Sequence, residues 1–151
     1  VAKMQLFPNE AFTRDARIVF LDDSIVRGTQ LKDNVVKLRE CGVKEVHIRI
    51  ACPPLIYPCC FLNFSTSRST FDLFARRVIR DLEGTSELTD EILKPYSDPD
   101  SEKYKEMVRV MCQHLQLDSL QFQRLDDLVK AIGLPKEQLC THCWDNSSYM
   151  E

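Results

Sequence analysis

The stretch "RIVFLDDSIVRGTQ", residues 17–30, decides the fold prediction. Its first five residues form a short apolar, β-branched run of the kind that is buried in a parallel sheet. Thr29 then stands at the position of a helix N-cap, and apolar residues recur after it at helical spacing as far as Gly42, a usual helix stop. The stretch therefore predicts a strand, a short loop and a helix.

The next segment extends this unit. "EVHIRIA" (45–51) alternates, with Val46, Ile48 and Ile50 on one face, and so predicts a second strand. Residues 17–51 together predict a β-α-β unit. Three prolines in "CPPLIYPCCF" (52–61) exclude regular structure there, so we expect a loop at the carboxyl edge of the sheet, where α/β proteins keep their binding sites.

Further periodic segments follow, and they complete the prediction of an α/β fold with a parallel sheet and flanking helices. The expected elements are a helix over 71–83 closed by Gly84, loop and short helix over 85–102, a helix over 103–117, a short strand over 119–125, and a helix over 126–134 capped by Asp126. A Cys-containing C-terminal tail closes the chain.

Composition sets broad limits on function. The chain has 151 residues, about one domain, with 44% hydrophobic and 28% charged residues, as in globular proteins. The net charge of -3 gives no sign of a nucleic-acid or membrane partner. The sequence has no signal peptide and no apolar run of about 18 residues, so we expect a cytoplasmic protein. Because Val1 rather than Met comes first, we expect a piece of a longer protein or a chain trimmed at its start.

The residues after the first strand combine acids with a phosphate-type loop. A loop that enters a helix offers free backbone N–H groups and the positive end of the helix dipole, and Ser24, Gly28 and Thr29 suit a phosphate monoester. Asp22 and Asp23 would repel that phosphate unless they bind something else. Carboxylates accept hydrogen bonds from vicinal hydroxyls and hold Mg²⁺, so ribose 5-phosphate fits both features. The alternative is an Asp pair that only caps the next helix.

The chain carries seven cysteines, an odd number without a secretory signal, which favours reduced thiols over a disulfide framework. "CTHC" (140–143) has metal-ligand spacing, but a site needs about four ligands. An iron–sulfur cluster, a Zn²⁺ site that uses His142, and no metal at all remain open. We expect three other cysteines to be small buried residues: Cys41, Cys52 and Cys112.

"VFLDDSIVRGT" resembles the phosphoribosyl diphosphate (PRPP) signature of the type I phosphoribosyltransferases, in the form found in the glutamine PRPP amidotransferase family. "GVKEVHIRIACPPLIYPC" is similar to the family's next strand and loop, and "FQRLDDLVKAIG" to a late stretch. The resemblance implies a partial type I phosphoribosyltransferase fold. Residues 1–134 would be the C-terminal portion of that domain, with 64–118 a divergent, mostly helical insert, and residues 135–151 a tail with the C-x-x-C pair.

Site residues follow from the resemblance. Asp22 and Asp23 would bind the ribose hydroxyls and the Mg²⁺ that accompanies PRPP. The 5-phosphate would be held largely by backbone amides and two hydroxyls, over the residues Ser24, Ile25, Val26, Arg27, Gly28 and Thr29. No residue of this chain is expected to act as a catalytic acid, base or nucleophile.

Members of one class in the family are similar in holding a [4Fe-4S] cluster with four cysteines. Cys59, Cys140 and Cys143 match three of these ligands, and the fourth would lie upstream of this chain. Cys60 is the alternative to Cys59.

The resemblance implies a glycosyltransferase that converts PRPP, glutamine and water to 5-phosphoribosylamine, diphosphate and glutamate, the first step of de novo purine (IMP) biosynthesis. Glutamine would be used through an N-terminal half that this chain lacks, so the chain is expected to be inactive alone. Purine nucleotides are expected as feedback ligands and a homo-oligomer as the assembly. The alternatives are a salvage phosphoribosyltransferase and a PRPP-binding regulatory or degenerate homologue without catalysis.

Three arginines recur within the helix expected over 71–83, namely Arg76, Arg77 and Arg80. The simplest interpretation is a solvated helix face. An anion or nucleotide site is the alternative.

Overall fold

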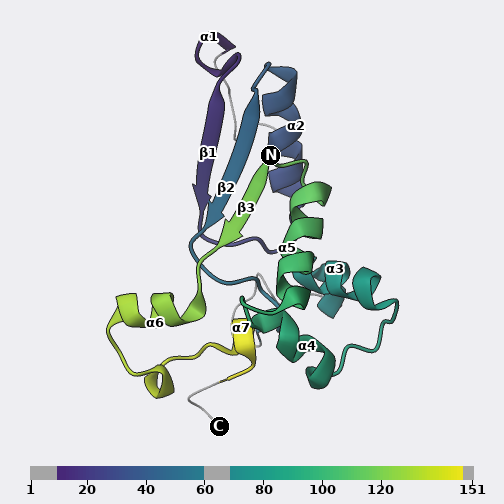
Figure 1. The fold of residues 1–151 in the computed structure, drawn as a ribbon, viewed down its shortest axis with the longest axis vertical. Coiled ribbons are helices and arrows are strands. Elements are labelled where there is room, and N and C mark those ends of the chain that lie inside the picture. Colours follow the sequence, from purple (N-terminus) through teal and green to yellow (C-terminus); the bar gives the residue numbers. More distant parts are fainter. Residues whose placement is uncertain (1–9, 60–68, 148–151) are drawn as a thin grey trace.

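The protein is described here by a computed structural model, which covers residues 10–59 and 69–147. In this part of the chain three strands form one sheet, with α2 and α5 next to it and α3, α4 and α7 beyond the strands' carboxyl ends (Figure 1). The strands are β1 (Arg17–Asp22), β2 (Glu45–Ile50) and β3 (Ser119–Phe122). The helices are α1 (Glu10–Thr13), α2 (Thr29–Glu40), α3 (Phe74–Glu83), α4 (Asp90–Ser97), α5 (Glu102–His114), α6 (Leu125–Ile132) and α7 (His142–Asp145), with 3-10 turns at Thr70–Asp72 and Lys136–Gln138.

The sheet is parallel and has the order β1-β2-β3. β1 and β2 pair over six residues, from Arg17 opposite Glu45 to Asp22 opposite Ile50. β3 then adds beside β2, with Ser119 opposite His47. This arrangement confirms the predicted α/β fold with a parallel sheet and flanking helices.

The core lies between the sheet and its helices. Val46 and Ile48 of the central strand are fully buried. α2 packs on this face through Val35 and Leu38, and α5 through Met107. Burial of such side chains is the main favourable term in folding, so packing against β2 stabilises both helices.

Two predicted helix caps are wrong. Gly28, not Thr29, is the N-cap of α2, because the chain turns there with φ 74°, a left-handed conformation that glycine adopts at little cost. Arg124, not Asp126, is the N-cap of α6, and Asp126 lies in the first turn, where a carboxylate suits the helix dipole.

Among the helices of the described residues, none combines the length and the apolar character that a membrane span requires.

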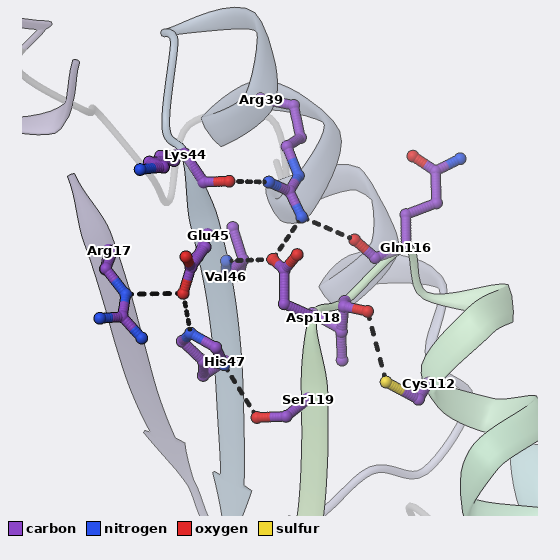
Figure 2. Close-up of polar contacts among 11 residues, drawn as sticks. Arg17, Arg39, Lys44, Glu45, Val46, His47, Cys112, Gln116, Asp118 and Ser119 are labelled. Carbon is purple, nitrogen blue, oxygen red and sulfur yellow. Dashed lines mark hydrogen bonds and ion pairs between the residues drawn. The ribbon is translucent and has the colours of Figure 1, made fainter. Parts of the chain in front are cut away.

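A cluster of polar side chains joins α2 to the sheet at the amino ends of β2 and β3 (Figure 2). The Asp118 carboxylate, just before β3, accepts hydrogen bonds from the Val46 N–H (2.6 Å) and from the Arg39 guanidinium (2.6 Å). Arg39 also donates to the carbonyls of Lys44 (2.8 Å) and Gln116 (3.3 Å). These contacts of Asp118 and Arg39 join the end of α2 to the starts of β2 and β3. The hydrogen bond from Val46 lowers the pKa of Asp118, and the interaction with Arg39 lowers it further.

Replacing Asp118 by Ala should lower the free energy of unfolding by about 1 to 3 kcal/mol, because the buried Val46 N–H loses its acceptor and Arg39 its partner. Chemical denaturation at pH 7 measures this effect. The exposed pair Glu106–Arg109 supplies the control, since Glu106→Ala should change the free energy of unfolding much less than Asp118→Ala does.

The pH dependence has a defined sign. A lowered pKa in the folded state adds stability above the unfolded value of about 3.9 and loses it as the pH falls through the folded pKa. The difference between the parent and Asp118→Ala should therefore shrink below about pH 4. A difference that stays constant down to pH 2 would contradict the ion-pair explanation.

Candidate functional site

The loop between β1 and α2, residues 23–28 and hereafter the β1–α2 loop, forms one wall of a cavity at the carboxyl edge of the sheet. The cavity has a volume of about 580 Å³ and is lined by residues 22–31 and Asn34. β1 ends at Asp22 because the strand pairing ends there, with the Ala51 N–H donating to the Asp22 carbonyl (2.9 Å). The chain must then turn into α2, and this turn brings all eight predicted PRPP-binding residues to one cavity.

The acidic pair opens the loop. The Asp22 carboxylate accepts the Asp23 N–H (3.0 Å), and the Asp23 carboxylate accepts the Ser24 N–H (2.8 Å). Partial burial raises the pKa of Asp22, against the lowering effect of the Asp23 N–H, and the neighbouring Asp23 carboxyl adds to the rise. No Lys, Arg or His among the described residues forms an ion pair with either aspartate. Hydroxyl donors or a cation would therefore stabilise both carboxylates.

The N-terminus of α2 is open toward the same cavity. Gly28 gives it no side-chain cap, and the first hydrogen bond of the helix is Lys32 N–H to the Gly28 carbonyl (3.0 Å). The preceding N–H groups of the first turn have no partner within the helix. N–H groups without an intrahelical acceptor and the positive end of the helix dipole suit an anion, and Thr29 is exposed beside them.

The remaining predicted residues differ in what their side chains do. Ile25 is buried in the core and anchors the loop, so only its backbone can face a ligand. Val26 and Ser24 are half-buried. The exposed Arg27 side chain lies 3.7 Å from the Asp72 carboxylate. An ideal Cβ on Gly28 would lie 3.1 Å from the Phe74 ring, so this close approach also favours glycine.

The solvated-face interpretation of the three arginines is wrong for two of them. Arg76 is buried and donates to the Ile56 carbonyl (2.7 Å). Arg77 donates to the Arg27 carbonyl in the β1–α2 loop (2.6 Å). Arg80 alone matches the expectation, since its bonds reach only the neighbouring Asp81. The spacing of three arginines in a helix cannot distinguish these environments, and so the contact of Arg77 with the loop is absent from the sequence prediction.

The C-terminal tail is fastened to the loop that follows β2. The Cys143 carbonyl accepts hydrogen bonds from the Ile56 N–H (2.9 Å) and the Tyr57 N–H (3.0 Å). Burial raises the pKa of the Cys143 thiol to about 12, with further contributions from Cys59 and then Cys140. The structure thus brings three predicted cluster cysteines into one neighbourhood, while in the part of the chain that it describes no three Cys, His, Asp or Glu side chains have the geometry of a metal site.

Three of the other cysteines were expected to be small buried residues. Cys41, Cys52 and Cys112 are half-buried rather than fully buried. Burial, together with the charges of the two site aspartates, raises the pKa of Cys52 to about 11, so its thiol stays protonated at neutral pH. Cys60, the alternative cluster ligand, lies outside the described residues.

Comparison with known proteins gives consistent matches. No family model matches the chain. An amidophosphoribosyltransferase from Mycobacterium tuberculosis is 30% identical over 150 residues, 99% of this chain and 24% of that protein. One from Pyrococcus horikoshii is 51% identical over 57 residues, 38% of this chain and 13% of that protein. The chain thus spans about a quarter or less of the length of these curated relatives.

Solved structures agree with the sequence matches. The glutamine PRPP amidotransferase from Bacillus subtilis, solved in complex with ADP and GMP, superposes with a TM-score of 0.60 and 25% identity, covering 91% of this chain and 25% of that one. A structure described as the allosteric regulatory enzyme of purine biosynthesis gives a TM-score of 0.57 and 27% identity over 91% of this chain. By sequence and by fold, the chain's homologues are amidophosphoribosyltransferases, and the match covers the C-terminal, phosphoribosyltransferase portion of these proteins.

Proposed function

We propose that this chain is the PRPP-binding portion of an amidophosphoribosyltransferase, which makes 5-phosphoribosylamine from PRPP, glutamine and water in de novo purine synthesis. The observation that carries the proposal is one cavity lined both by two aspartates, which have no cationic partner among the described residues, and by the N-terminus of α2, which has no side-chain cap. Residues 1–134 would belong to the phosphoribosyltransferase domain and residues 135–151 to a tail. Glutamine chemistry, feedback nucleotides and assembly of several copies would involve the rest of such an enzyme.

The two halves of the site suit the two ends of a ribose 5-phosphate group. Asp22 and Asp23 would accept hydrogen bonds from the ribose hydroxyls, as ionised carboxylates do. The amides of residues 24–29 and the hydroxyls of Ser24 and Thr29 would hold the 5-phosphate, helped by the dipole of α2. The ligand would be fixed at both ends, so the chain's contribution to the reaction would be to orient the anomeric carbon.

Magnesium fits the same carboxylates. Oxygen ligands of this type are those that Mg²⁺ prefers, and the described residues offer no competing cation. When bound, Mg²⁺ supplies positive charge that stabilises the departing diphosphate. Asp22 and Asp23 would hold it, and they would orient the ribose at the same time.

An iron–sulfur cluster fits the tail cysteines in part. Cys59, Cys140 and Cys143 supply three thiols in one neighbourhood, and the bonds from Ile56 and Tyr57 to Cys143 hold the tail there. We propose that these thiols bind a [4Fe-4S] cluster whose fourth ligand lies elsewhere in the protein. Its role would be structural, clamping α7 against the loop after β2.

The aspartate pair supplies the first test. Asp22→Asn with Asp23→Asn should weaken PRPP binding by about hundredfold or more, because charged acceptors for the ribose hydroxyls are lost. Calorimetric titration of the full-length gene product with PRPP and MgCl₂ measures this. Asp33→Asn is the matched control, since Asp33 lies on α2 outside the cavity lining and should leave binding unchanged. Equal affinity of the double variant and the parent would rule out the assignment of the carboxylates, and a parent that does not bind PRPP would rule out the proposed function.

The tail cysteines supply the second test. Full-length protein purified without oxygen should be brown and contain about four iron and four sulfide per chain. Cys140→Ser and Cys143→Ser should each lose most of the iron, whereas Cys41→Ser should keep it, because Cys41 is the C-cap of α2 and is not one of the proposed ligands. Colourless protein with stoichiometric zinc, or iron that survives both serine variants, would contradict the cluster.

A further inference from the structure

We propose that Arg77 positions the β1–α2 loop for phosphate binding by turning its carbonyl groups away from the cavity. The inference rests on the proposed function, because it gives Arg77 a task only if this loop binds a phosphate group. Arg77 lies on α3, and it does not line the cavity. It would therefore act through the loop and not on the ligand.

The contacts between α3 and the loop come from behind the cavity. The Phe74 N–H at the start of α3 donates to the Val26 carbonyl at 2.7 Å. The Arg77 guanidinium donates to the next carbonyl, that of Arg27, at 2.6 Å. Two successive loop carbonyls are thus held toward α3, and none of the residues that line the cavity comes from this helix.

The direction of the carbonyls determines the direction of the amides. The described residues contain no cis peptide bond, and in a trans peptide the C=O of one residue and the N–H of the next point in opposite directions. With the Val26 and Arg27 carbonyls directed toward α3, the N–H groups of Arg27 and Gly28 point to the opposite side. Both residues line the cavity, so these amides are available to an anion there.

The same contacts remove a repulsive group from the site. A carbonyl oxygen carries partial negative charge, and one directed at a phosphate would oppose its binding. Free loops adopt many peptide orientations, and fixing the useful one before the ligand arrives lowers the entropic cost of binding. Arg77 therefore contributes to affinity without touching the ligand.

This set of contacts with loop and helix carbonyls, here called the carbonyl clamp, requires arginine in particular. Besides the Arg27 carbonyl, the Arg77 guanidinium donates to the carbonyls of Phe71 (3.2 Å) and Asp72 (3.0 Å), and its Cζ atom lies 5.4 Å from the centre of the Phe74 ring. Planar, forked donors allow one side chain to serve three carbonyls and an aromatic face. A lysine would keep the charge but could not reproduce this geometry.

Calorimetric titration of the full-length gene product with ribose 5-phosphate tests the proposal. Arg77→Gln should raise the Kd about tenfold or more at unchanged stoichiometry, since a charge-assisted hydrogen bond is lost. Arg77→Lys should bind with intermediate affinity. Arg80→Gln is the matched control on the same helix and should bind like the parent, because among the described residues the Arg80 guanidinium interacts with Asp81 and the Phe71 ring and not with the β1–α2 loop.

The possible results distinguish a failure of the proposed function from a failure of the role assigned to Arg77. A parent that does not bind ribose 5-phosphate overturns both the proposed function and this inference. A parent that binds, with Arg77→Gln binding equally well, overturns only the role of Arg77. A fall in the number of binding sites at unchanged Kd would also overturn it, since that result indicates partial unfolding. Should Arg77→Gln fail to fold, Arg77→Lys decides alone, and binding equal to the parent would show that charge suffices without the carbonyl clamp.

Discussion

The parallel pairing of β1 with β2 is the constraint on which the rest of the structure depends. Because the two strands are parallel and in register from Arg17 to Asp22, both chain segments leave the sheet at the same edge. The segment after β1 becomes the β1–α2 loop, and the segment after β2 becomes the loop that reaches Cys59. The site and the tail thus share one edge of the sheet, as is usual for ligand sites in α/β proteins.

The helices after β2 support this edge from outside the β-α-β unit. α3 contacts the β1–α2 loop through Phe74 and Arg77, and through Arg76 it also holds the carbonyl of Ile56. Ile56 in turn donates to Cys143 of the tail. One helix therefore connects the proposed phosphate site to the proposed cluster site, although neither site contains a side chain of that helix.

Much of this could be predicted from the sequence, for physical reasons that differ between elements. The alternation at 45–51 reports directly on burial, so β2 was predictable. The apolar run at 17–21 correctly predicted a strand that pairs in parallel with β2, but its expected burial is wrong, because Val19 and Leu21 are exposed. The acidic pair and the loop could be singled out as a candidate site because few residue types bind ribose hydroxyls, Mg²⁺ or phosphate. Helix boundaries were less certain: Thr29 is a good capping residue by type, but the left-handed turn at Gly28 displaced the cap by one position. The roles of Arg76 and Arg77 could not be predicted, because both depend on which carbonyls the fold brings within reach.

The most direct test of the central claim is a crystal structure of the protein with ribose 5-phosphate and Mg²⁺. The account predicts the phosphate within about 2.7 to 3.2 Å of the backbone nitrogens of residues 24–29, with the ribose hydroxyls on Asp22 and Asp23. It also predicts that the Val26 and Arg27 carbonyls still point toward α3. A phosphate bound elsewhere, or a ribose whose hydroxyls face away from both carboxylates, would contradict the account.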